Sequence, residues 1–439
     1  MGCAAAARRP RRHANGNGFC ERAVMGRTSK TATAIGWLIG VLVASAAVFA
    51  AATAVLTIFF ARRVVTPEQK VKRGVERILG VDLARATIGL ASTDETRMRG
   101  TYGFWFDTDA GHARLGDVLD DDGRIVHRRI DAVDFGRLDR ATHGRMSGWV
   151  HLGPWELGRP YQDVSVPTAL GPAPAWFVPS VGDADDDGPA ADWVIQVHGR
   201  GAKRHEGIRA IEPITDAGWS TLLISYRNDG EAPESVDRRY GLGGTEWADV
   251  EAAVRFATER GARRIVLMGW SMGGSIALQA VLRSSEVRDH LVGVILDSPA
   301  IDWVDILRFQ GRALGLPTGL GDAVAHVLGE PWSGGLTGLA APVEVDELDP
   351  VARATEFAVP MLLMHSADDG FVPVDGSRRL AAARPDLIRF EEFTGARHTK
   401  LWNHDPERWS TLIGDWLGEV AEATRPAPTP APTSPAPAA

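Results

Sequence analysis

The chain has 439 residues, of which 44% are hydrophobic and 24% charged, so enough apolar material is present for a sizeable globular core. Its formal net charge of −8 is uneven, because residues 1–33 carry seven Lys or Arg and one Glu, a net +6 that leaves −14 for the remainder. An acidic main body argues against nucleic acid as a partner.

The basic leader, residues 1–33, holds both cysteines of the chain, Cys3 and Cys20. The folded body therefore has no disulfide and no cysteine-ligated metal. We expect the Ala- and Arg-rich leader to be disordered. Met25, within it, is an alternative start of the protein.

Residues 34–61 form an uncharged stretch of Ala, Val, Leu, Ile and Phe. As a helix these 28 residues are about 42 Å long, enough to cross a hydrocarbon core of roughly 30 Å. The stretch predicts a transmembrane helix and a single-pass membrane protein. A cleaved secretory signal is the competing interpretation, for which Phe49-Ala-Ala-Ala52 supplies small residues, but the apolar run continues to Phe60.

The side of the membrane on which the body lies stays open. Positive charges near the stretch are fewer before it than after it; they are Arg22, Arg27 and Lys30 before, and Arg62, Arg63, Lys70, Lys72, Arg73 and Arg77 after. This count favours a cytoplasmic body by the positive-inside rule. Four further arginines in the leader make the numbers of positive charges on the two sides nearly equal if the long leader is present.

Residues 62–160 lie between the apolar stretch and the main body. The pattern from Val64 to about Asp82 predicts a juxtamembrane helix. From Thr101 to Val150 the aromatic run Tyr102–Phe106 and the turn Asp120-Asp-Asp-Gly123 favour short strands and hairpins. We expect a small β-rich segment packed on the main domain.

Residues 161–423 alternate between strand-length apolar runs and helical stretches. An antiparallel pair opens the region, at 164–166 and 175–178. The later strands are expected at 193–198, 220–225, 265–268, 291–296, 361–364 and 388–393, and the helices at 208–216, 247–260, 275–283, 376–383 and 406–420. This alternation predicts a mostly parallel sheet with helices on both faces. Residues 300–350 look like a cap, and the Pro- and Ala-rich tail, 424–439, is expected to be disordered.

The motif with the most chemical content is Gly-Trp-Ser-Met-Gly-Gly at residues 269–274, directly between a predicted strand and a predicted helix. This is the arrangement of a nucleophile elbow, with Ser271 at its apex. Gly269 and Gly273 flank the serine because a Cβ atom at either place would collide with the tight turn. The amide N–H of Met272, at the start of the helix, points to where a substrate oxyanion would form.

A serine elbow calls for an acid and then a base, each in a loop after a later strand. Two such loops are present, at His365–Pro373 and at Thr394–His398. With these motifs, residues 160–423 resemble the α/β-hydrolase family, in particular its esterases and serine-aminopeptidase-like hydrolases. The resemblance implies that Asp369, four residues before the Pro of Asp-x-x-Val-Pro, is the acid, and that His398, in a Gly-x-x-His turn, is the base.

Two other acids remain open: Asp368, if the loop is shifted by one residue, and Asp297, after the preceding strand. The resemblance also implies a second oxyanion donor in the loop His198-Gly-Arg-Gly201. We assign it to the backbone N–H of Arg200, although Arg stands where the lipase-like pattern has Gly.

Several other residues have a structural interpretation beside a functional one. His404 fits the start of a helix, His198 and His365 fit loop-ordering roles, and Glu246 fits compensation of a helix dipole. Asp183–Gly188 begins like a calcium loop, but Val194 occupies the twelfth position, so a solvated loop is favoured. Four basic residues near the expected active-site mouth either attract an acidic substrate or form surface ion pairs: Arg200, Lys203, Arg204 and Arg227.

These observations predict a membrane-anchored serine hydrolase that acts on a small-molecule or lipid-like ester with Ser271, His398 and Asp369, and with no cofactor and no metal. A serine peptidase of the aminopeptidase-like kind is the first alternative, since the same triad cleaves amides. A membrane-tethered binding module without catalysis is the second. Substrate identity is set by the cap and the pocket shape, which the sequence does not reveal.

Overall fold

The structure is a computed structural model that describes residues 20–68, 74–181 and 192–425. These fall into two units, Met1–Leu56 and Thr57–Ala439, which are described separately. Residues 1–19 of the leader, the calcium-loop-like segment 183–188 and residues 426–439 of the tail lie outside the described residues.

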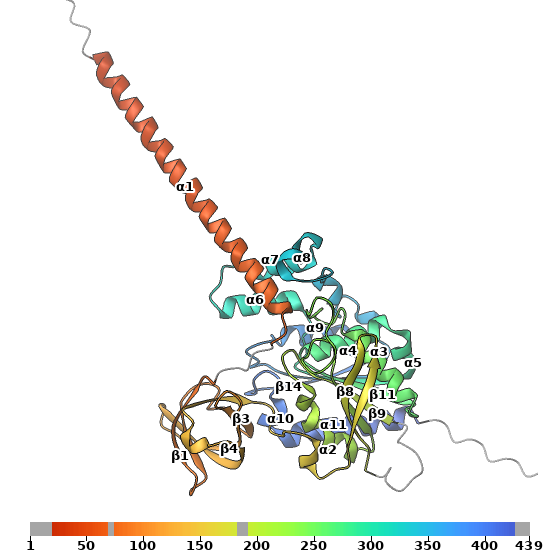
Figure 1. The fold of residues 1–439 in the computed structure, drawn as a ribbon. Helices are drawn as coiled ribbons and strands as arrows, with labels where there is room; N and C mark the ends of the chain where they lie inside the picture. The colour runs from red at the N-terminus through yellow and green to blue at the C-terminus, as the bar shows by residue number, and fades with distance from the viewer. Residues whose placement is uncertain (1–19, 69–73, 182–191, 426–439) are drawn as a thin grey trace, which may run out of the picture. The chain divides into compact units, whose positions relative to one another are not determined.

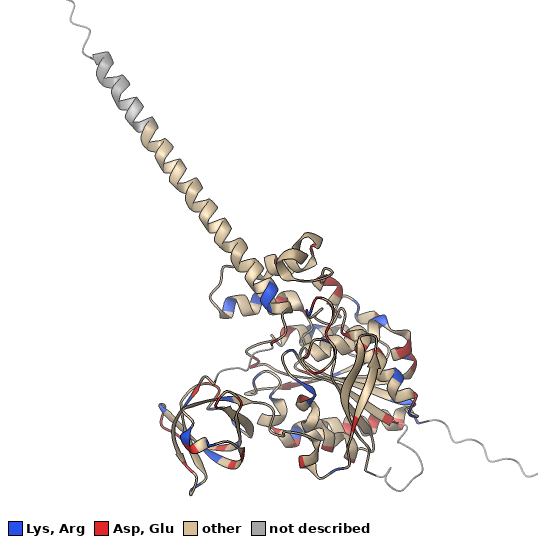
Figure 2. Cartoon of the chain, in the orientation of Figure 1, with Lys and Arg blue, Asp and Glu red and all other residues tan. Residues whose placement is uncertain are grey.

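One long helix, α1 (Cys20–Val65), contains all of the described part of the first unit. Its portion Thr33–Val65 is long and apolar enough to cross a membrane, a property that it shares with signal sequences near an N-terminus. Figure 2 shows this portion free of charge until Arg62 and Arg63 at its end. The helix is longer than the predicted 34–61, so residues 20–33 are helical and the prediction of disorder there is wrong. Propagating a helix beyond an apolar segment costs little once the helix exists.

The second unit begins with a closed six-stranded antiparallel barrel, in the order β1-β2-β5-β4-β3-β6 (Figure 1). Its strands are β1 (Glu76–Asp82), β2 (Thr87–Ala91), β3 (Tyr102–Phe106), β4 (Gly111–Asp121), β5 (Ile125–Phe135) and β6 (His143–Ser147). The predicted β-rich segment is therefore present, but it begins at Glu76 and not at Thr101. A short 3-10 helix, η1 (Leu138–Arg140), lies between β5 and β6, and a second, η2 (Pro154–Leu157), follows β6.

The predicted helix from Val64 to Asp82 is wrong. Helix α1 ends at Val65, and Glu76–Asp82 pairs with β2 and β6 as strand β1. Pro67 explains the end of the helix, because its ring disfavours a helical residue before it and it lacks the N–H that a helix interior needs.

The main domain is an eight-stranded sheet in the order β14-β13-β12-β11-β9-β10-β8-β7. Its strands are β7 (Gln162–Thr168), β8 (Gly171–Val178), β9 (Asp192–Val197), β10 (Ser220–Ile224), β11 (Arg264–Trp270), β12 (Leu291–Asp297), β13 (Met361–Ser366) and β14 (Ile388–Phe393). The last six are parallel, and β7 and β8 add an antiparallel edge. The predicted α/β-hydrolase sheet is confirmed.

Helices cover both faces of this sheet (Figure 1). They are η3 (Arg204–Ala210), α2 (Ile211–Asp216), α3 (Trp247–Thr258), α4 (Met272–Arg283), α5 (Ser285–His290), α9 (Asp375–Ala383), α10 (Leu401–His404) and α11 (Pro406–Ala423). On one face α11 and α2 bury a tryptophan-rich core that includes Trp219, Trp409 and Trp416. On the other, α3 and α4 contact each other and pack on β9 and β11.

The region between β12 and β13, predicted as an irregular cap, is mainly helical. It contains α6 (Trp303–Ala313), α7 (Leu320–Gly329), η4 (Pro331–Ser333), α8 (Gly334–Thr337), η5 (Val345–Leu348) and η6 (Ala354–Glu356). The glycines and prolines that hid the helical period from the sequence lie between these short helices.

The register of the parallel strands brings their carboxyl ends to one edge. Trp270 of β11 is level with Asp297 of β12, which is level with Met364 of β13, and His365 is level with Glu392 of β14. The loops that leave these strands therefore begin side by side, where ligand sites of parallel sheets form.

Candidate active site

Ser271 occupies the sharp turn between β11 and α4. It adopts φ 50° and ψ −119°, a backbone conformation that is strained for a residue with a side chain. The turn is held in place because Ser271 N donates to Asp297 O at 3.1 Å and Ser271 O accepts from Ala300 N at 2.9 Å. A Cβ atom at Gly273 would collide with the carbonyl oxygen of Val197, so glycine is required beside the serine.

A chain of hydrogen bonds leads away from this serine. Ser271 Oγ lies 2.9 Å from His398 Nε2, and His398 Nδ1 lies 2.7 Å from Asp369 Oδ2. Because an ionised carboxylate only accepts, Nδ1 carries the proton and Nε2 accepts the serine O–H. The three side chains come from the loops after β11, β14 and β13, so the residues selected from the sequence meet at the edge where the strands end.

Asp369 is fixed from several sides. Its Oδ1 accepts from the amides of Phe371 and Val372 at 2.8 and 2.9 Å, and its Oδ2 accepts from His365 Nε2 at 3.2 Å as well as from His398. Its side chain is buried. Although burial opposes ionisation, the charges and hydrogen bonds of His398 and His365 hold the pKa of Asp369 well below its usual range.

The two alternative acids lie elsewhere. Asp368 Oδ2 accepts from the Gly395 amide at 2.6 Å. This bond connects the loop that contains Asp369 (the acid loop) to the loop that contains His398. Asp297 accepts from Trp409 Nε1 and from Ser298 Oγ, both at 2.9 Å, and burial raises its pKa. Neither carboxylate is bonded to His398, so the geometry favours Asp369.

His398 combines two opposing influences. Burial disfavours its charged form, but the nearby carboxylates, Asp369 first and then Glu206 and Asp297, outweigh this and raise the pKa of His398 above its ordinary value. A base whose protonated form is stabilised in this way accepts the serine proton more readily.

Three further histidines that the sequence singled out are His365, His198 and His404. His365 Nε2 lies 3.2 Å from Val372 O and from Asp369, both acceptors, so it carries a proton, and Nδ1 then accepts from Ser377 Oγ at 2.7 Å. His198 Nε2 lies 3.1 Å from Asp229. His404 is the last residue of α10, and Asp405, not His404, caps α11, which corrects the expected helix-start role.

The loop after β9 lies directly against the serine, since a Cβ atom at Gly199 would be 3.1 Å from Ser271 Cβ. The Gly199 amide donates to Glu206 Oε2 at 2.7 Å. The amides of Arg200 and Met272, the expected oxyanion donors, have no acceptor in the described part of the chain. Glu206, which fixes this loop, was missed in the sequence because it lies in a short 3-10 helix without a motif.

The four basic residues near the site all have carboxylate partners. The shortest distances to them are 3.5 Å for Arg200 and Glu68, 3.1 Å for Lys203 and Glu231, 3.4 Å for Arg204 and Glu231, and 2.8 Å for Arg227 and Asp249. The ion-pair interpretation of these charges therefore fits the structure.

Glu246 directly precedes helix α3, as expected, and its side chain also contacts the loop before that helix. Its buried carboxylate accepts from the amides of Gly241 and Gly243 at 2.7 and 3.0 Å. It therefore closes the loop before α3. The sequence suggested a helix start because Glu246 directly precedes that helix.

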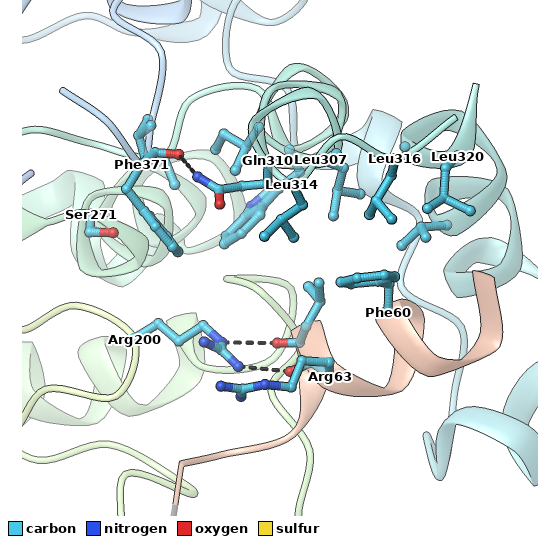
Figure 3. Close-up of a pocket in the computed structure, with 18 of the residues that line it drawn as sticks. Phe60, Arg63, Arg200, Ser271, Leu307, Gln310, Leu314, Leu316, Leu320 and Phe371 are labelled. Atoms are coloured by element: carbon cyan, nitrogen blue, oxygen red, sulfur yellow. Dashed lines mark hydrogen bonds between the residues drawn. The ribbon is translucent and has the colours of Figure 1, made fainter. Parts of the chain in front are cut away.

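Ser271 lines one cavity, of about 290 Å³. Its other walls are mostly apolar side chains of the cap helices α6 and α7, of the acid loop and of the end of helix α1 (Figure 3). Among the described residues, no group of three or more His, Cys, Asp or Glu side chains is placed to hold a metal ion.

Comparison with known families assigns the two domains of the second unit. Residues 194–411 match the Alpha/beta hydrolase family, and residues 77–147 match a domain of unknown function (DUF8805). The chain belongs to the α/β-hydrolase family.

Individual relatives are distant. A 2-hydroxy-6-oxononadienedioate/2-hydroxy-6-oxononatrienedioate hydrolase from Paraburkholderia xenovorans is 24% identical over 266 residues, which cover 53% of this chain and 89% of that one. An esterase from Pyrococcus furiosus has a TM-score of 0.46 and 19% identity, with 62% of this chain and 94% of that chain covered. A puromycin-hydrolyzing peptidase from Mycobacterium tuberculosis has a TM-score of 0.44 and 19% identity, with coverage of 76% and 45%.

Proposed function

We propose that this α/β hydrolase is a membrane-anchored serine hydrolase that cleaves carboxylic esters through an acyl-enzyme. The observation that carries the proposal is the chain of hydrogen bonds from Ser271 Oγ through His398 to Asp369, at a serine held in a strained turn between strand and helix. Nucleophile, base and orienting acid are the three parts that acyl transfer by serine requires.

In the first half of the reaction, His398 Nε2 accepts the hydroxyl proton of Ser271 while Oγ attacks the ester carbonyl carbon. The carbonyl electron pair moves onto oxygen, where the amides of Met272 and Arg200 donate to the oxyanion. The oxyanion then collapses, the bond to the alkoxide breaks, and the imidazolium gives its proton to the departing alcohol. Asp369 keeps the imidazole in the required tautomer throughout.

In the second half, water attacks the acyl group on Ser271 and His398 accepts its proton. The second tetrahedral intermediate releases the carboxylic acid and returns the proton to Ser271. The cycle needs no group beyond the three side chains, the two amides, the ester and water.

Ester cleavage is favoured over aminopeptidase-like cleavage by the cavity. A free α-ammonium group needs an available carboxylate, since an unpaired charge is costly to bury. Among the described residues, the carboxylate that lines the cavity is Glu68, which lies 2.9 Å from Arg63 and 3.5 Å from Arg200 and is therefore neutralised.

Membrane anchoring is proposed from the apolar portion Thr33–Val65 of helix α1. Residues 33–56, the part of this portion that belongs to the first unit, by themselves exceed the roughly 20 residues needed to cross a bilayer.

The test of the proposed function is labelling by a fluorophosphonate, which reacts with an activated serine. We expect the full chain to be labelled and Ser271→Ala to lose labelling and ester turnover. Ser275→Ala, which removes another buried hydroxyl of the same turn and helix, is the matched control and should keep both.

Absence of labelling in the full chain, or equal labelling of Ser271→Ala, would refute the serine-hydrolase proposal. Activity confined to aminoacyl amides, with none on p-nitrophenyl esters, would instead replace the ester by an amide as the substrate.

A further inference from the structure

The last turns of helix α1, residues 57–65, differ from the rest of that helix because they are packed on the hydrolase domain. Thr57, Ala61 and Val65 are 5%, 0% and 0% exposed, whereas the large apolar side chains of residues 35–55 are more than half exposed. The three residues are spaced by four and therefore lie on one face of the helix. The second unit thus begins with a helical segment that belongs to its own fold.

The side chain of Arg200 holds the end of this segment. Its Nε donates to Val64 O at 2.9 Å, and its Nη2 donates to Arg63 O at 2.8 Å and to Thr66 O at 3.0 Å. The last carbonyls of a helix lack partners within the helix, so a cation placed there satisfies them and favours the dipole. The residue with a proposed oxyanion amide therefore also caps the end of helix α1, the helix that contains the apolar stretch.

The same segment forms part of the cavity wall. Phe60 and Val64 line the cavity, and Figure 3 shows Phe60 facing Leu314, Leu316 and Leu320 of the cap. Among the residues labelled in Figure 3, Ser271 lies at the opposite end from Phe60, and Phe371 lies beside Ser271. From the serine to Phe60 the lining consists mainly of aliphatic and aromatic side chains, which favour an apolar ligand group.

We propose that residues 57–66 are part of the active site, and that Phe60 determines which acyl chain length the enzyme prefers. This inference rests on the proposed serine hydrolase. The substrate class is then an ester with an unbranched aliphatic acyl chain, whose carbonyl lies at Ser271 and whose chain end reaches Phe60. Arg200 acts as a positioning residue, because its guanidinium holds this wall in place.

The first test is the acyl-chain profile of the full chain with p-nitrophenyl butyrate, hexanoate, octanoate, decanoate and laurate, normalised to the amount of enzyme that a fluorophosphonate titrates. We expect Phe60→Ala to raise kcat/KM for long chains relative to short ones, by roughly fourfold for each methylene newly accommodated. Phe60→Trp should shift the preference toward shorter chains. Opposite shifts from two substitutions at one position are not produced by partial unfolding.

Phe59→Ala is the matched control, because Phe59 is the neighbouring aromatic residue, is 60% exposed and does not line the cavity. We expect its profile to equal that of the wild type. The inference is overturned if both Phe60 variants keep the wild-type profile, or if Phe59→Ala shifts it as much as Phe60→Ala does.

Arg200→Met keeps the backbone amide but removes the three bonds to the helix end. We expect weaker discrimination between chain lengths, with the loss mainly in KM for the preferred ester, and partial rescue by Arg200→Lys. Lys203→Met, in the same loop, should leave the profile unchanged. The positioning role would be contradicted if the fluorophosphonate titrated less active enzyme in Arg200→Met while the preference for acyl chain length stayed unchanged.

A second readout separates this inference from the proposed chemistry. In Ser271→Ala, a methyl ester with a diazirine at the end of its acyl chain should cross-link to residues 57–68, and excess unlabelled ester should suppress the reaction. If the wild type neither labels nor hydrolyses esters, the proposed chemistry fails while suppressible cross-linking still supports the pocket. Cross-linking that excess ester does not suppress would overturn the pocket itself.

Discussion

Ser271 shows how the surroundings of a single residue hold it in an unusual backbone conformation. Its φ of 50° costs backbone energy, of order 1–3 kcal/mol for such conformations. The surrounding bonds to Asp297 O and Ala300 N and the close approach of the Val197 carbonyl to Gly273 maintain this strain. The result is a hydroxyl within 2.9 Å of His398 Nε2.

The choice between neighbouring acids is testable at this scale. We expect Asp369→Asn to lower kcat/KM by roughly 10³- to 10⁴-fold, because an amide no longer holds the required tautomer of His398. Asp368→Asn is the matched control and should keep most of its activity, since Asp368 bonds the Gly395 amide. Ester kinetics of both variants measure this, and the reverse order of losses would move the assignment by one residue.

The pH profile provides a separate prediction. The reaction needs neutral His398, and nearby carboxylates raise its pKa above the ordinary 6.5. Activity is therefore present above this raised pKa and is lost as the pH falls through it. We expect the decline of kcat/KM at low pH to have its midpoint above pH 6.5. The profile is measured with an ester that does not itself titrate in this pH range. A midpoint below 6.5 would show that burial outweighs the carboxylates.

At the scale of elements, the residues that join the barrel to the hydrolase domain came from the structure alone. Buried Asn403 donates to Thr101 O at 2.8 Å and to Gly148 O at 3.0 Å, and accepts from Arg209 Nη1 at 3.1 Å. Its side chain thus links the residues just before β3 and just after β6 of the barrel to helix α10, which follows the proposed base. Asn403 belongs to no motif, and its partners are about 200 to 300 positions away in sequence.

The parallel strands were predictable because strands buried on both faces appear as continuous apolar runs between turn residues. The runs at 291–296 and 361–364 lie within β12 and β13. The first barrel strands were not predicted, because Glu76–Asp82 mixes charged and apolar residues and its pairing partner was not evident. The cap was hard to describe for a similar reason, since its helices are short and separated by Gly and Pro.

At the scale of the whole molecule, the proposed membrane anchoring rests on the apolar portion Thr33–Val65. We expect the full chain to remain in the membrane pellet after alkaline carbonate extraction. Leu42→Arg combined with Ala46→Arg should release it, since an arginine at the centre of a membrane helix costs roughly 2.5–3.5 kcal/mol on insertion scales. Immunoblots of pellet and supernatant measure the outcome.

Two observations would contradict the anchor. A mature protein shortened from its N-terminus and found in the supernatant would identify the segment as a cleaved signal. Equal extraction of the wild type and the double variant would show that the segment does not hold the protein in the membrane. Leu119→Arg, on an exposed position of barrel strand β4, controls for the effect of added charge.

The sequence by itself determined the α/β-hydrolase fold and the candidates Ser271, Asp369 and His398, because an elbow and two loop motifs are local patterns whose order along the chain is fixed. It also determined the apolar stretch, which depends on composition alone. Only the tertiary structure decided which acid meets His398, what Arg200 binds, and that the end of helix α1 lines the cavity. These depend on contacts between residues far apart in the chain, such as Arg200 and Val64, and a sequence pattern does not encode which distant carbonyls a side chain reaches.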